Sequence, residues 1–487
     1  MTPLLEIRAL SVWLGERCMV GPVSLTLEHG QSLTILGETG AGKSLLLKAI
    51  IGALPVPFTS QGEIWWAGQA LHRMSASERE NLWGRVFSIL PQEPSLALDP
   101  LMRLSRQAEE VPALLRNHDA ATCRTQSSQH FEAVGLTGHE AKYPVQLSGG
   151  MAQRGAYVCA VSGGGEILIA DEPTKGLDDH HRARLVEMLQ QYRQQGALLT
   201  VTHDIEVAEQ LGGTILVIQH GTVVEQGEAS TVLAGPQHAY TRQLVSAHPR
   251  HWPMLNHHQP GEVLLRVNQL KMAVEQRVLF EDLSFELRAG EVLGIRGPSG
   301  CGKSTLCQAV LGLRTPQAGE IEYLQPLAVG QKLKLYQDPP GAFASHVSLG
   351  TLIDDICRRY QIDDAVPLAL MKRLHLDPAL LQQSATQVSG GELQRFAILR
   401  VLLLKPKLLI ADEPTTRLDP STAQETLTLI LEAVREINCA LLLVSHEQSL
   451  LEKVCHRVIE LAPEPTGSEE DDTMAAQSVA TAESCTG

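Results

Sequence analysis

The chain has 487 residues, of which 44% are hydrophobic but only 4% aromatic, and this predicts about two or three domains with aliphatic cores. Its formal net charge of −15 would repel phosphate backbones, so nucleic acid is not an expected partner. No apolar run reaches the ~18 residues that cross a bilayer, the first residues lack a secretory pattern, and the nine cysteines form no CxxC pair. We therefore expect neither a membrane-embedded, nor a secreted, nor a disulfide-stapled protein.

Short apolar segments that predict buried strands recur along the chain. In chain order they are residues 32–37, 167–171 and 197–203, followed by residues 292–297, 408–412 and 440–446. Near-continuous apolar runs are typical of parallel strands that are covered on both faces. The first segment of each half leads into a glycine-rich loop and then an aliphatic helix. The predicted fold class is therefore α/β, with ligands bound at the carboxyl ends of the strands.

The second half of the sequence repeats the first. The segment LGETGAGKSLLLKAIIGAL returns as RGPSGCGKSTLCQAVLGLR, QLSGG returns as QVSGG, and ILIADEPT returns as LLIADEPT. So long a period indicates a duplicated domain rather than a solenoid. The second copy is shorter between its glycine-rich loop and the next shared glutamine, and we expect this deletion in a surface hairpin.

Two segments of distinct composition delimit the domains. The stretch between the halves contains prolines and histidines without apolar periodicity, which favours a solvated linker over a metal site. The end of the chain is acidic and lacks lysine and arginine, which predicts disorder. The predicted organisation is a first domain over 1–250, a linker over 251–262, a second domain over 263–463 and a disordered acidic tail over 464–487.

Both halves contain the pattern GxxxxGKS after a predicted strand. Its glycines let backbone N–H groups approach a phosphate, and the helix that follows adds positive potential. The lysine reaches the β- and γ-phosphates, and the serine hydroxyl ligates Mg²⁺. The predicted ligands are ATP and Mg²⁺, and the predicted contacts are Gly37, Gly40, Gly42, Lys43 and Ser44 in the first half, and Gly297, Gly300, Gly302, Lys303, Ser304 and Thr305 in the second.

A carboxylate pair and a histidine follow later predicted strands in each half: Asp171, Glu172 and His203 in the first, and Asp412, Glu413 and His446 in the second. An aspartate at such a strand end can hold Mg²⁺ through water, and the glutamate can orient and polarise an attacking water. An isolated Asp-Glu pair is about as often a helix N-cap as it is a catalytic pair. A lone histidine is more often structural, so the matched positions are what favour a role at the γ-phosphate.

This order of motifs resembles the nucleotide-binding domain of ABC ATPases over residues 1–463. The resemblance implies two tandem domains, each with a RecA-like core and a helical subdomain that carries a Leu-Ser-Gly-Gly signature. In this family the signature of one domain closes over the ATP held by the other, which implies two composite sites. The residues that match are Ser148, Gly149, Gly150, Ser389, Gly390 and Gly391 in the signatures, Gln92 and Gln337 between Mg²⁺ and the helical subdomain, and Asp178 and Asp419 between the two sites.

Two segments resemble a narrower branch of this family. Gln92-Glu-Pro-Ser-Leu-Ala-Leu-Asp-Pro resembles a segment of the ATPases that drive dipeptide, oligopeptide and nickel importers. Residues 235–249 resemble the "HPYT" extension of the same branch, although an ordinary amphipathic helix is the alternative. Many relatives carry a four-cysteine motif beyond this extension. Because no cysteine lies between Cys159 and Cys301, we expect no iron–sulfur cluster.

The resemblance implies an ATPase that energises the import of small peptides, nickel or a metal chelate such as an opine metallophore. Its implied partners are two transmembrane permease subunits and, indirectly, a substrate-binding protein. Its implied location is peripheral, at the cytoplasmic face of the inner membrane. The alternatives are a soluble non-transport ABC ATPase and an exporter ATPase.

The family also docks its permeases beside the shared glutamine. We therefore expect contacts near residues 92–100 and 337–343, with Leu96, Leu98 and Phe343 as exposed apolar residues. The alternative is a rigid loop without a docking role.

Overall fold

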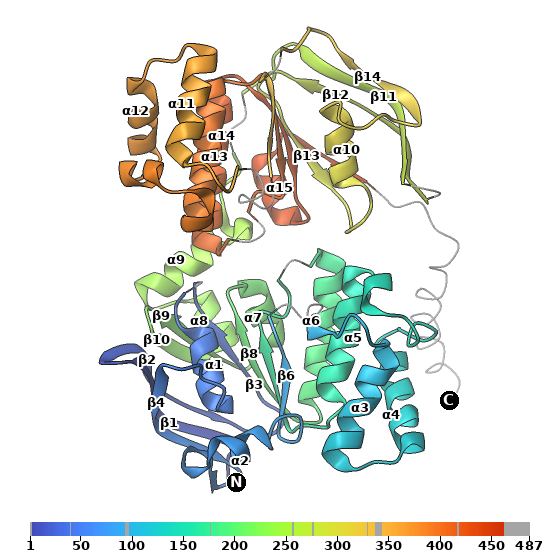
Figure 1. Cartoon of the computed structure of the whole chain (residues 1–487), viewed down its shortest axis with the longest axis vertical. Helices are drawn as coiled ribbons and strands as arrows, with labels where there is room; N and C mark the ends of the chain where they lie inside the picture. Colours follow the sequence, from blue (N-terminus) through green and yellow to red (C-terminus); the bar gives the residue numbers. More distant parts are fainter. Residues whose placement is uncertain are drawn as a thin grey trace. The chain divides into compact units, whose positions relative to one another are not determined.

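The computed structural model describes residues 2–38, 40–92, 97–175, 177–255, 258–274, 277–328, 330–336, 343–415 and 418–461. These residues form two compact units, which divide between Ser246 and Ala247 (Figure 1). The predicted tail over 464–487 lies outside the described residues. In the described part of the chain, no helix combines the length and the apolarity that a membrane span requires.

Two β-sheets form the framework of the first unit. A six-stranded sheet has the order β10-β9-β3-β8-β7-β6, and all of its neighbouring strands run parallel except β9 and β10. An antiparallel sheet has the order β2-β1-β4-β5. The strands are β1 (Leu5–Leu14), β2 (Arg17–Leu27), β3 (Ser32–Leu36), β4 (Phe58–Trp66), β5 (Gln69–Ala70), β6 (Phe87–Leu90), β7 (Ile167–Asp171), β8 (Ala197–Thr202), β9 (Thr214–Gln219) and β10 (Thr222–Glu228).

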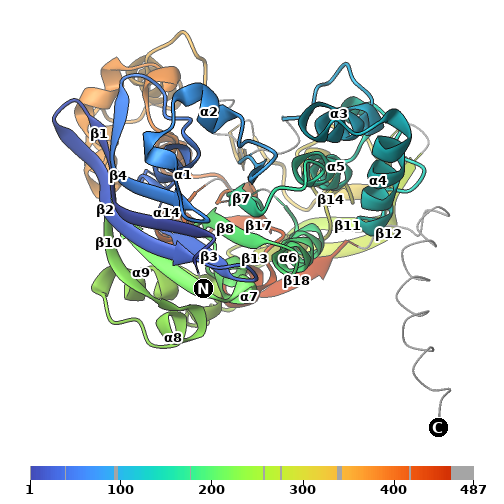
Figure 2. The ribbon, with the colours of Figure 1, turned by 90° about the horizontal axis from the view of Figure 1, so that it is seen from below.

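The helices of the first unit divide into two groups. Figure 2 shows α3, α4 and α5 standing beside the sheets as a separate helical group, and these three helices contact one another. The helix α1 follows β3 directly and packs near the antiparallel sheet. The helices are α1 (Lys43–Ile51), α2 (Ala76–Glu80), α3 (Leu104–Arg116), α4 (Ala120–Ala133), α5 (Gly149–Val161), α6 (Asp179–Arg193), α7 (Ile205–Leu211), α8 (Ala229–Ala234) and α9 (Ala239–Ala247), with short 3₁₀ turns η1 (Leu71–Arg73) and η3 (Pro144–Gln146).

The second unit has the same plan. Its main sheet is entirely parallel, with the order β15-β16-β17-β13-β18, and its smaller sheet is antiparallel, with the order β12-β11-β14. The strands are β11 (Val263–Val274), β12 (Arg277–Arg288), β13 (Val292–Arg296), β14 (Ala318–Tyr323), β15 (Lys332–Leu335), β16 (Leu408–Asp412), β17 (Ala440–Val444) and β18 (Arg457–Glu460). The helices are α10 (Lys303–Val310), α11 (Leu349–Tyr360), α12 (Ala365–Arg373), α13 (Gly390–Leu404), α14 (Pro420–Glu436) and α15 (Gln448–Val454), with 3₁₀ turns η4 (Pro249–His251), η6 (Pro378–Gln382) and η7 (Ala385–Gln387).

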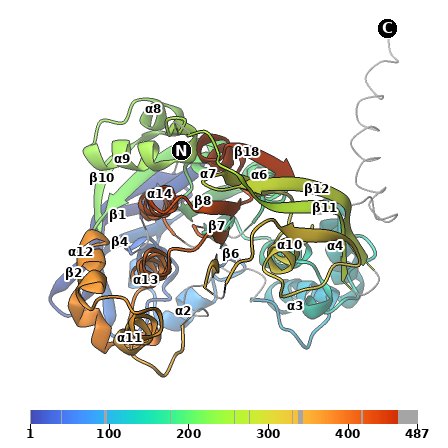
Figure 3. The same ribbon diagram turned by 90° about the horizontal axis from the view of Figure 1, so that it is seen from above.

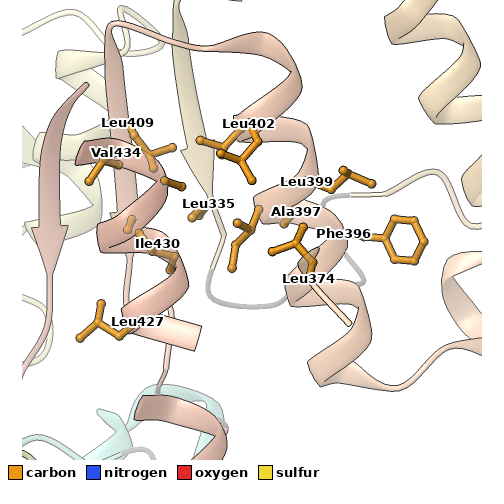
Figure 4. Close-up of a cluster of buried hydrophobic side chains, with 14 of the residues drawn as sticks. Leu335, Leu374, Phe396, Ala397, Leu399, Leu402, Leu409, Leu427, Ile430 and Val434 are labelled. Atoms are coloured by element: carbon orange, nitrogen blue, oxygen red, sulfur yellow. The ribbon is translucent and has the colours of Figure 1, made fainter. Parts of the chain in front are cut away.

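The helical group of the second unit joins its sheet through an aliphatic core. Figure 3 shows α11, α12 and α13 grouped away from β11 and β12. In Figure 4 side chains of β15, β16, α13 and α14 converge on one cluster, which includes Leu335, Leu402, Leu409, Ile430 and Val434. Full burial of each such side chain contributes about 2 kcal/mol. This cluster therefore fixes the position of α13 relative to the strand end at Asp412.

The predicted α/β fold is confirmed, and the six predicted apolar segments form β3, β7, β8, β13, β16 and β17. The deletion that we expect in a surface hairpin of the second copy removes more than a hairpin. Between β4 and β6 the first unit contains the short strand β5, the turn η1 and the helix α2. The guanidinium of Arg79 on α2 donates to the carbonyl oxygens of Ala49 (2.9 Å) and Ile50 (2.6 Å), so this insertion caps the end of α1.

Candidate functional site

The lysine of each glycine-rich loop, hereafter the P-loop, is buried and held by its own loop. The Nζ of Lys43, a residue that is 5% exposed, donates to the carbonyl oxygens of Gly37 (2.6 Å) and Glu38 (2.9 Å). In the second unit the Nζ of Lys303 makes the same two contacts at 2.7 and 3.0 Å. Each loop therefore carries a positive charge at the start of a helix, where an anion is also favoured by the helix dipole.

Glycine is required at the turn into each helix. Gly42 and Gly302 precede α1 and α10 with φ of 95° and 105°. A Cβ on Gly42 would lie 2.2 Å from a methyl carbon of Val20, so a side chain there is excluded twice, by conformation and by space. Among the described residues, apart from each glycine and its chain neighbours, no atom lies within 4 Å of where a Cβ on Gly40 or Gly300 would be, which leaves room for a phosphate to approach the backbone. The remaining predicted loop residues, Gly37, Ser44, Gly297, Ser304 and Thr305, lie in the same two segments.

In the first unit, five predicted residues from three segments meet at the end of β7. The Ser44 hydroxyl donates to Oδ1 of Asp171 over 3.2 Å. Oε1 of Glu172 lies 3.6 Å from Nζ of Lys43, and its Oε2 lies 2.8 Å from Nδ1 of His203. The P-loop, β7 and the segment after β8 therefore place a hydroxyl, two carboxylates, an ammonium and an imidazole together.

The second unit assembles the equivalent residues with different distances. The Ser304 hydroxyl donates to Oδ1 of Asp412 over 3.4 Å, and Oε1 of Glu413 lies 3.8 Å from Nδ1 of His446. A residue without a counterpart charge in the first unit, Lys334 of β15, places its Nζ 2.7 Å from Oδ2 of Asp412. The two units thus share their reactive residues but differ in the cation beside the strand-end aspartate.

The backbone at both predicted catalytic glutamates is left-handed. Glu172 has φ of 48° and Glu413 has φ of 49°, values that residues with a side chain seldom adopt. Their N–H groups donate to the carbonyl oxygens of Val201 (2.8 Å) and Val444 (3.0 Å), which hold this conformation. Repetition of such strain at the same place in both copies is typical of functional positions.

The pKa values of the two carboxylates in the first unit are shifted in opposite directions. Burial raises the pKa of Glu172, but the contacts with His203 and Lys43 outweigh it, so the pKa lies below its usual value. Burial raises the pKa of Asp171, and the hydrogen bond from Ser44 opposes this only in part. Glu172 is therefore ionised at neutral pH and able to accept a hydrogen bond from an attacking water.

The donor set suits Mg²⁺. Each unit aligns a serine hydroxyl with an aspartate carboxylate at the P-loop, namely Ser44 with Asp171 and Ser304 with Asp412. Mg²⁺ prefers hard oxygen ligands of this kind together with phosphate oxygens. When bound, Mg²⁺ supplies charge neutralisation of the phosphates, and Glu172 and Glu413 remain available for water.

The signature segments cap two long helices. Ser148 precedes α5 and accepts from the Met151 N–H (3.3 Å), while Ser389 precedes α13 and forms a reciprocal capping box with Glu392. Both serines and the glycines that follow them, Gly149 and Gly390, are exposed. The first N–H groups of a helix lack partners within the helix, so these ends can bind an anion. The third signature residues, Gly150 and Gly391, lie in the first turn of the same helices.

The other predicted residues lie at segment ends. Asp178 and Asp419 are the N-caps of α6 and α14, and each accepts from the third N–H of its helix, at 2.9 and 3.1 Å. Gln92 is exposed just after β6. Gln337 lies outside the described residues.

Three residues that the sequence interpretation missed connect parts of this site. The buried Gln153 donates to the carbonyl oxygen of Pro173, and Gln394 donates to that of Pro414 (3.3 Å), which ties each signature helix to the loop after its strand-end glutamate. The repeated Gln-Arg pair after each signature was the available signal. The third residue is Tyr240, which lies on α9 within the HPYT-like segment and accepts from the Glu38 N–H.

The predicted docking residues are wrong as exposed positions. Leu98 is only 5% exposed and packs into the core of the first helical group, and Phe343 is 8% exposed beneath the guanidinium of Arg400. Leu96 lies outside the described residues. Each of the two segments turns toward the helices of its own unit, and this turn buries its apolar side chain. The sequence alone did not reveal the turn. Leu101, which follows this segment directly, is 87% exposed.

A family model described as ABC transporter matches residues 20–175 and 280–416, which include both P-loops and both strand-end carboxylate pairs. The chain belongs to the ABC transporter family. It is similar to the uncharacterized ABC transporter ATP-binding protein YejF of Escherichia coli strain K12, with 34% identity over 94% of this chain and 93% of that protein. It is 30% identical to the glutathione import ATP-binding protein GsiA of Pectobacterium atrosepticum, over 93% of this chain and 84% of that protein.

Among solved structures, the archaeal ribosome recycling factor aABCE1 in its complex with the ribosomal stalk protein aP1 is similar in fold alone. It shares 21% identity and a TM-score of 0.63, covering 90% of this chain and 84% of that chain. Membership of the ABC family establishes that this protein is an ATPase with two ABC domains and that its cofactors are ATP and Mg²⁺.

Proposed function

We propose that this ABC ATPase energises an importer of small peptides. The observation that carries the proposal is the similarity, over 93% of this chain, to an ATP-binding protein named for glutathione import. Glutathione is a tripeptide, so a peptide backbone and its terminal charges are the chemistry such a system recognises. The segment that begins at Gln92, with its resemblance to the peptide and nickel importer branch, supports the same assignment. Nickel and metal chelates of the opine metallophore type are the second substrate class that this branch implies.

We also propose two composite ATP sites. In this arrangement one ATP contacts Lys43 and Ser44 together with the second signature, and the other contacts Lys303 and Ser304 together with the first signature. The exposed, N-capped ends of α5 and α13 support the proposal, because they offer unpaired helix N–H groups to a phosphate. The proposed roles of the remaining residues are water activation by Glu172 and Glu413, γ-phosphate sensing by His203 and His446, Mg²⁺ ligation by Ser44, Gln92, Asp171, Ser304, Gln337 and Asp412, and communication between sites by Asp178 and Asp419.

The proposed partners are two transmembrane permease subunits and, through them, a substrate-binding protein. The proposed location is the cytoplasmic face of the inner membrane, where the chain binds peripherally. An ATPase of this kind never touches the solute, so the substrate class must be read from transport rather than from ligand binding to the purified chain.

Uptake measurements test the proposed substrate class. Cells that lack this chain should regain the uptake of labelled small peptides with the wild-type chain but not with the double variant Lys43→Ala and Lys303→Ala, because neither P-loop of the variant can hold phosphate. Nickel uptake should not change. Restoration of nickel or metal-chelate uptake alone would replace the peptide assignment, and an absence of any transport difference would refute the importer assignment.

Two further measurements test the partners and the sites. Purification from native membranes should yield the chain together with two permease subunits, and recovery of the chain without them would refute the proposed assembly. A structure of the double variant Glu172→Gln and Glu413→Gln with ATP should show each nucleotide between a P-loop and the opposite signature. Both nucleotides lodged within single halves would overturn the composite sites.

A further inference from the structure

A lysine of the second unit stands where the first unit has an isoleucine. In the parallel ladder of the first unit, Ile89 of β6 pairs with the residue two positions before Asp171. In the second unit, Lys334 of β15 pairs with the residue two positions before Asp412. The two side chains therefore occupy the same place in the fold, on the strand beside the one that ends in the Mg²⁺-binding aspartate.

Strand geometry directs Lys334 to the P-loop face of the sheet. Figure 4 shows Leu335 among the buried side chains that join β15 to α13, and successive residues of a strand point to opposite faces. Lys334 thus faces the side covered by α10, the helix that follows the P-loop. The electrostatic influence of both Lys334 and Asp412 on the buried thiol of Cys307, which lies on α10, agrees with this placement.

The ammonium of Lys334 is held at the aspartate. Its Nζ lies 2.7 Å from Oδ2 of Asp412, and the two side chains are only 11% and 9% exposed. The aromatic ring of Tyr336 lies 5.1 Å from the same Nζ, a distance at which a cation is attracted to a ring face. In the first unit the corresponding Ile89 instead packs against the apolar cluster that includes the P-loop helix.

Two cations would compete for one carboxylate. Mg²⁺ held by Ser304 and Asp412 would share the aspartate with a nearby ammonium, and like charges repel strongly where little water screens them. We propose that Lys334 lowers the Mg²⁺ affinity of the second P-loop site, so that this site requires more free Mg²⁺ than the first to bind nucleotide together with the metal. The inference uses only the ATP and Mg²⁺ binding of the family and does not depend on the proposed importer role.

Binding measurements on one site at a time test this difference. The background Lys43→Ala leaves the second P-loop intact, and the background Lys303→Ala leaves the first. In each background, the free Mg²⁺ concentration that gives half-maximal binding of a fluorescent ATP analogue is measured, with EDTA as the zero point. We expect this concentration to be about tenfold higher for the second site. Mn²⁺ binding followed by electron paramagnetic resonance should rank the sites in the same order.

A reciprocal exchange isolates the side chain responsible. Lys334→Ile in the Lys43→Ala background should lower the required Mg²⁺ about tenfold, and Ile89→Lys in the Lys303→Ala background should raise it by a similar factor. Lys332→Ile is the matched control, because Lys332 lies on the same strand with its Nζ over the Tyr323 ring rather than at Asp412. This control should leave the Mg²⁺ requirement unchanged.

A second variant keeps the test interpretable if Lys334→Ile does not fold. Lys334→Gln removes the charge but keeps a hydrogen-bond donor for Asp412, so it should fold and show the same direction of shift as Lys334→Ile. Equal Mg²⁺ requirements in the two backgrounds, or no shift from Lys334→Gln and Ile89→Lys, would overturn the proposal. A shift from Lys332→Ile as large as that from Lys334→Ile would also overturn it, because the effect would then come from net charge alone.

Discussion

The backbone N–H of Glu38 in the first P-loop donates a hydrogen bond of 2.8 Å to the hydroxyl oxygen of Tyr240, which lies 202 residues later in the chain. Tyr240 is on α9 and is 3% exposed. In the second P-loop Pro298 occupies the position of Glu38, and proline has no N–H to satisfy. The HPYT-like segment of the first unit therefore supplies a hydrogen-bond acceptor for an N–H that the second P-loop does not have.

Removal of the Tyr240 hydroxyl should reduce the order of the first P-loop and its affinity for ATP without a corresponding effect on the second. Tyr240→Phe leaves the Glu38 amide without its acceptor, which should lower the free energy of unfolding by about 1 kcal/mol. It should also lower ATP affinity at the first site, measured in the Lys303→Ala background, because the loop is less ordered. Tyr157→Phe is the matched control: its buried hydroxyl donates to the Met188 carbonyl oxygen (3.1 Å) away from the P-loop. A similar loss of ATP affinity in both variants would show that Tyr240 acts only through general stability.

Neutralising both proposed catalytic glutamates should separate binding from hydrolysis. The double variant Glu172→Gln and Glu413→Gln should bind ATP but hydrolyse it about a hundredfold or more slowly, because an amide cannot accept the proton of the attacking water. Phosphate release and equilibrium ATP binding measure the two properties independently. Hydrolysis at the wild-type rate would exclude these glutamates from catalysis.

The sequence predicted the sheet of each unit because its strands are buried on both faces. Segments such as residues 408–412 are apolar throughout, and only a parallel strand covered by helices suits such a run. The P-loops were equally predictable, because their spacing follows from how a backbone must turn to approach a phosphate. What periodicity could not predict was the insertion with α2, since a five-residue helix that caps α1 has no apolar repeat of its own.

The sequence could not predict side-chain burial in the proposed docking segments, residues 92–100 and 337–343, for a different reason. Prolines precede Leu98 and Phe343 within the same segments, a composition typical of exposed loops, yet each packs against helices that come later in the chain. Lys334 was missed because the alternating lysines and leucines of β15 are typical of a strand at the edge of a sheet. The role proposed for Lys334 depends on its ion pair with Asp412, and this ion pair forms only in the folded sheet.

Near Gln92, solvent exposure distinguishes the buried Leu98, which has a structural role, from the exposed Leu101, which is available to a docking partner. Leu98→Asp places a charge in the first helical group and should lower the free energy of unfolding by about 3 kcal/mol or more. Leu101→Asp should change it by less than about 0.5 kcal/mol, because this side chain is exposed. Chemical denaturation of both variants measures these values. If the proposed permeases dock at this segment, Leu101→Asp should reduce peptide uptake while leaving ATP hydrolysis near the wild-type rate; unchanged uptake would move the docking surface elsewhere.

The pH dependence of stability should report the contacts of Glu172. Because His203 and Lys43 hold the pKa of Glu172 below its usual value, the folded state binds its proton less readily than the unfolded state. The stability from these contacts is therefore fully present above the unfolded pKa of about 4.5 and is lost as the pH falls through the lower folded pKa. The wild-type chain should exceed Glu172→Gln in unfolding free energy at about pH 7, and this advantage should shrink below about pH 4.

The comparison with Glu172→Gln removes the contributions of groups that Glu172 does not contact. The raised pKa of Asp171 acts in the opposite direction, since burial favours its protonated form. The charge of Glu172 adds to this rise, so part of the Asp171 contribution remains in the difference. Denaturant unfolding followed across this pH range supplies the free energies. If the advantage over Glu172→Gln stays constant down to about pH 3, the ion contacts of Glu172 do not stabilise the fold, because a lowered pKa would let the unfolded state take up the proton first and would reduce the advantage below about pH 4.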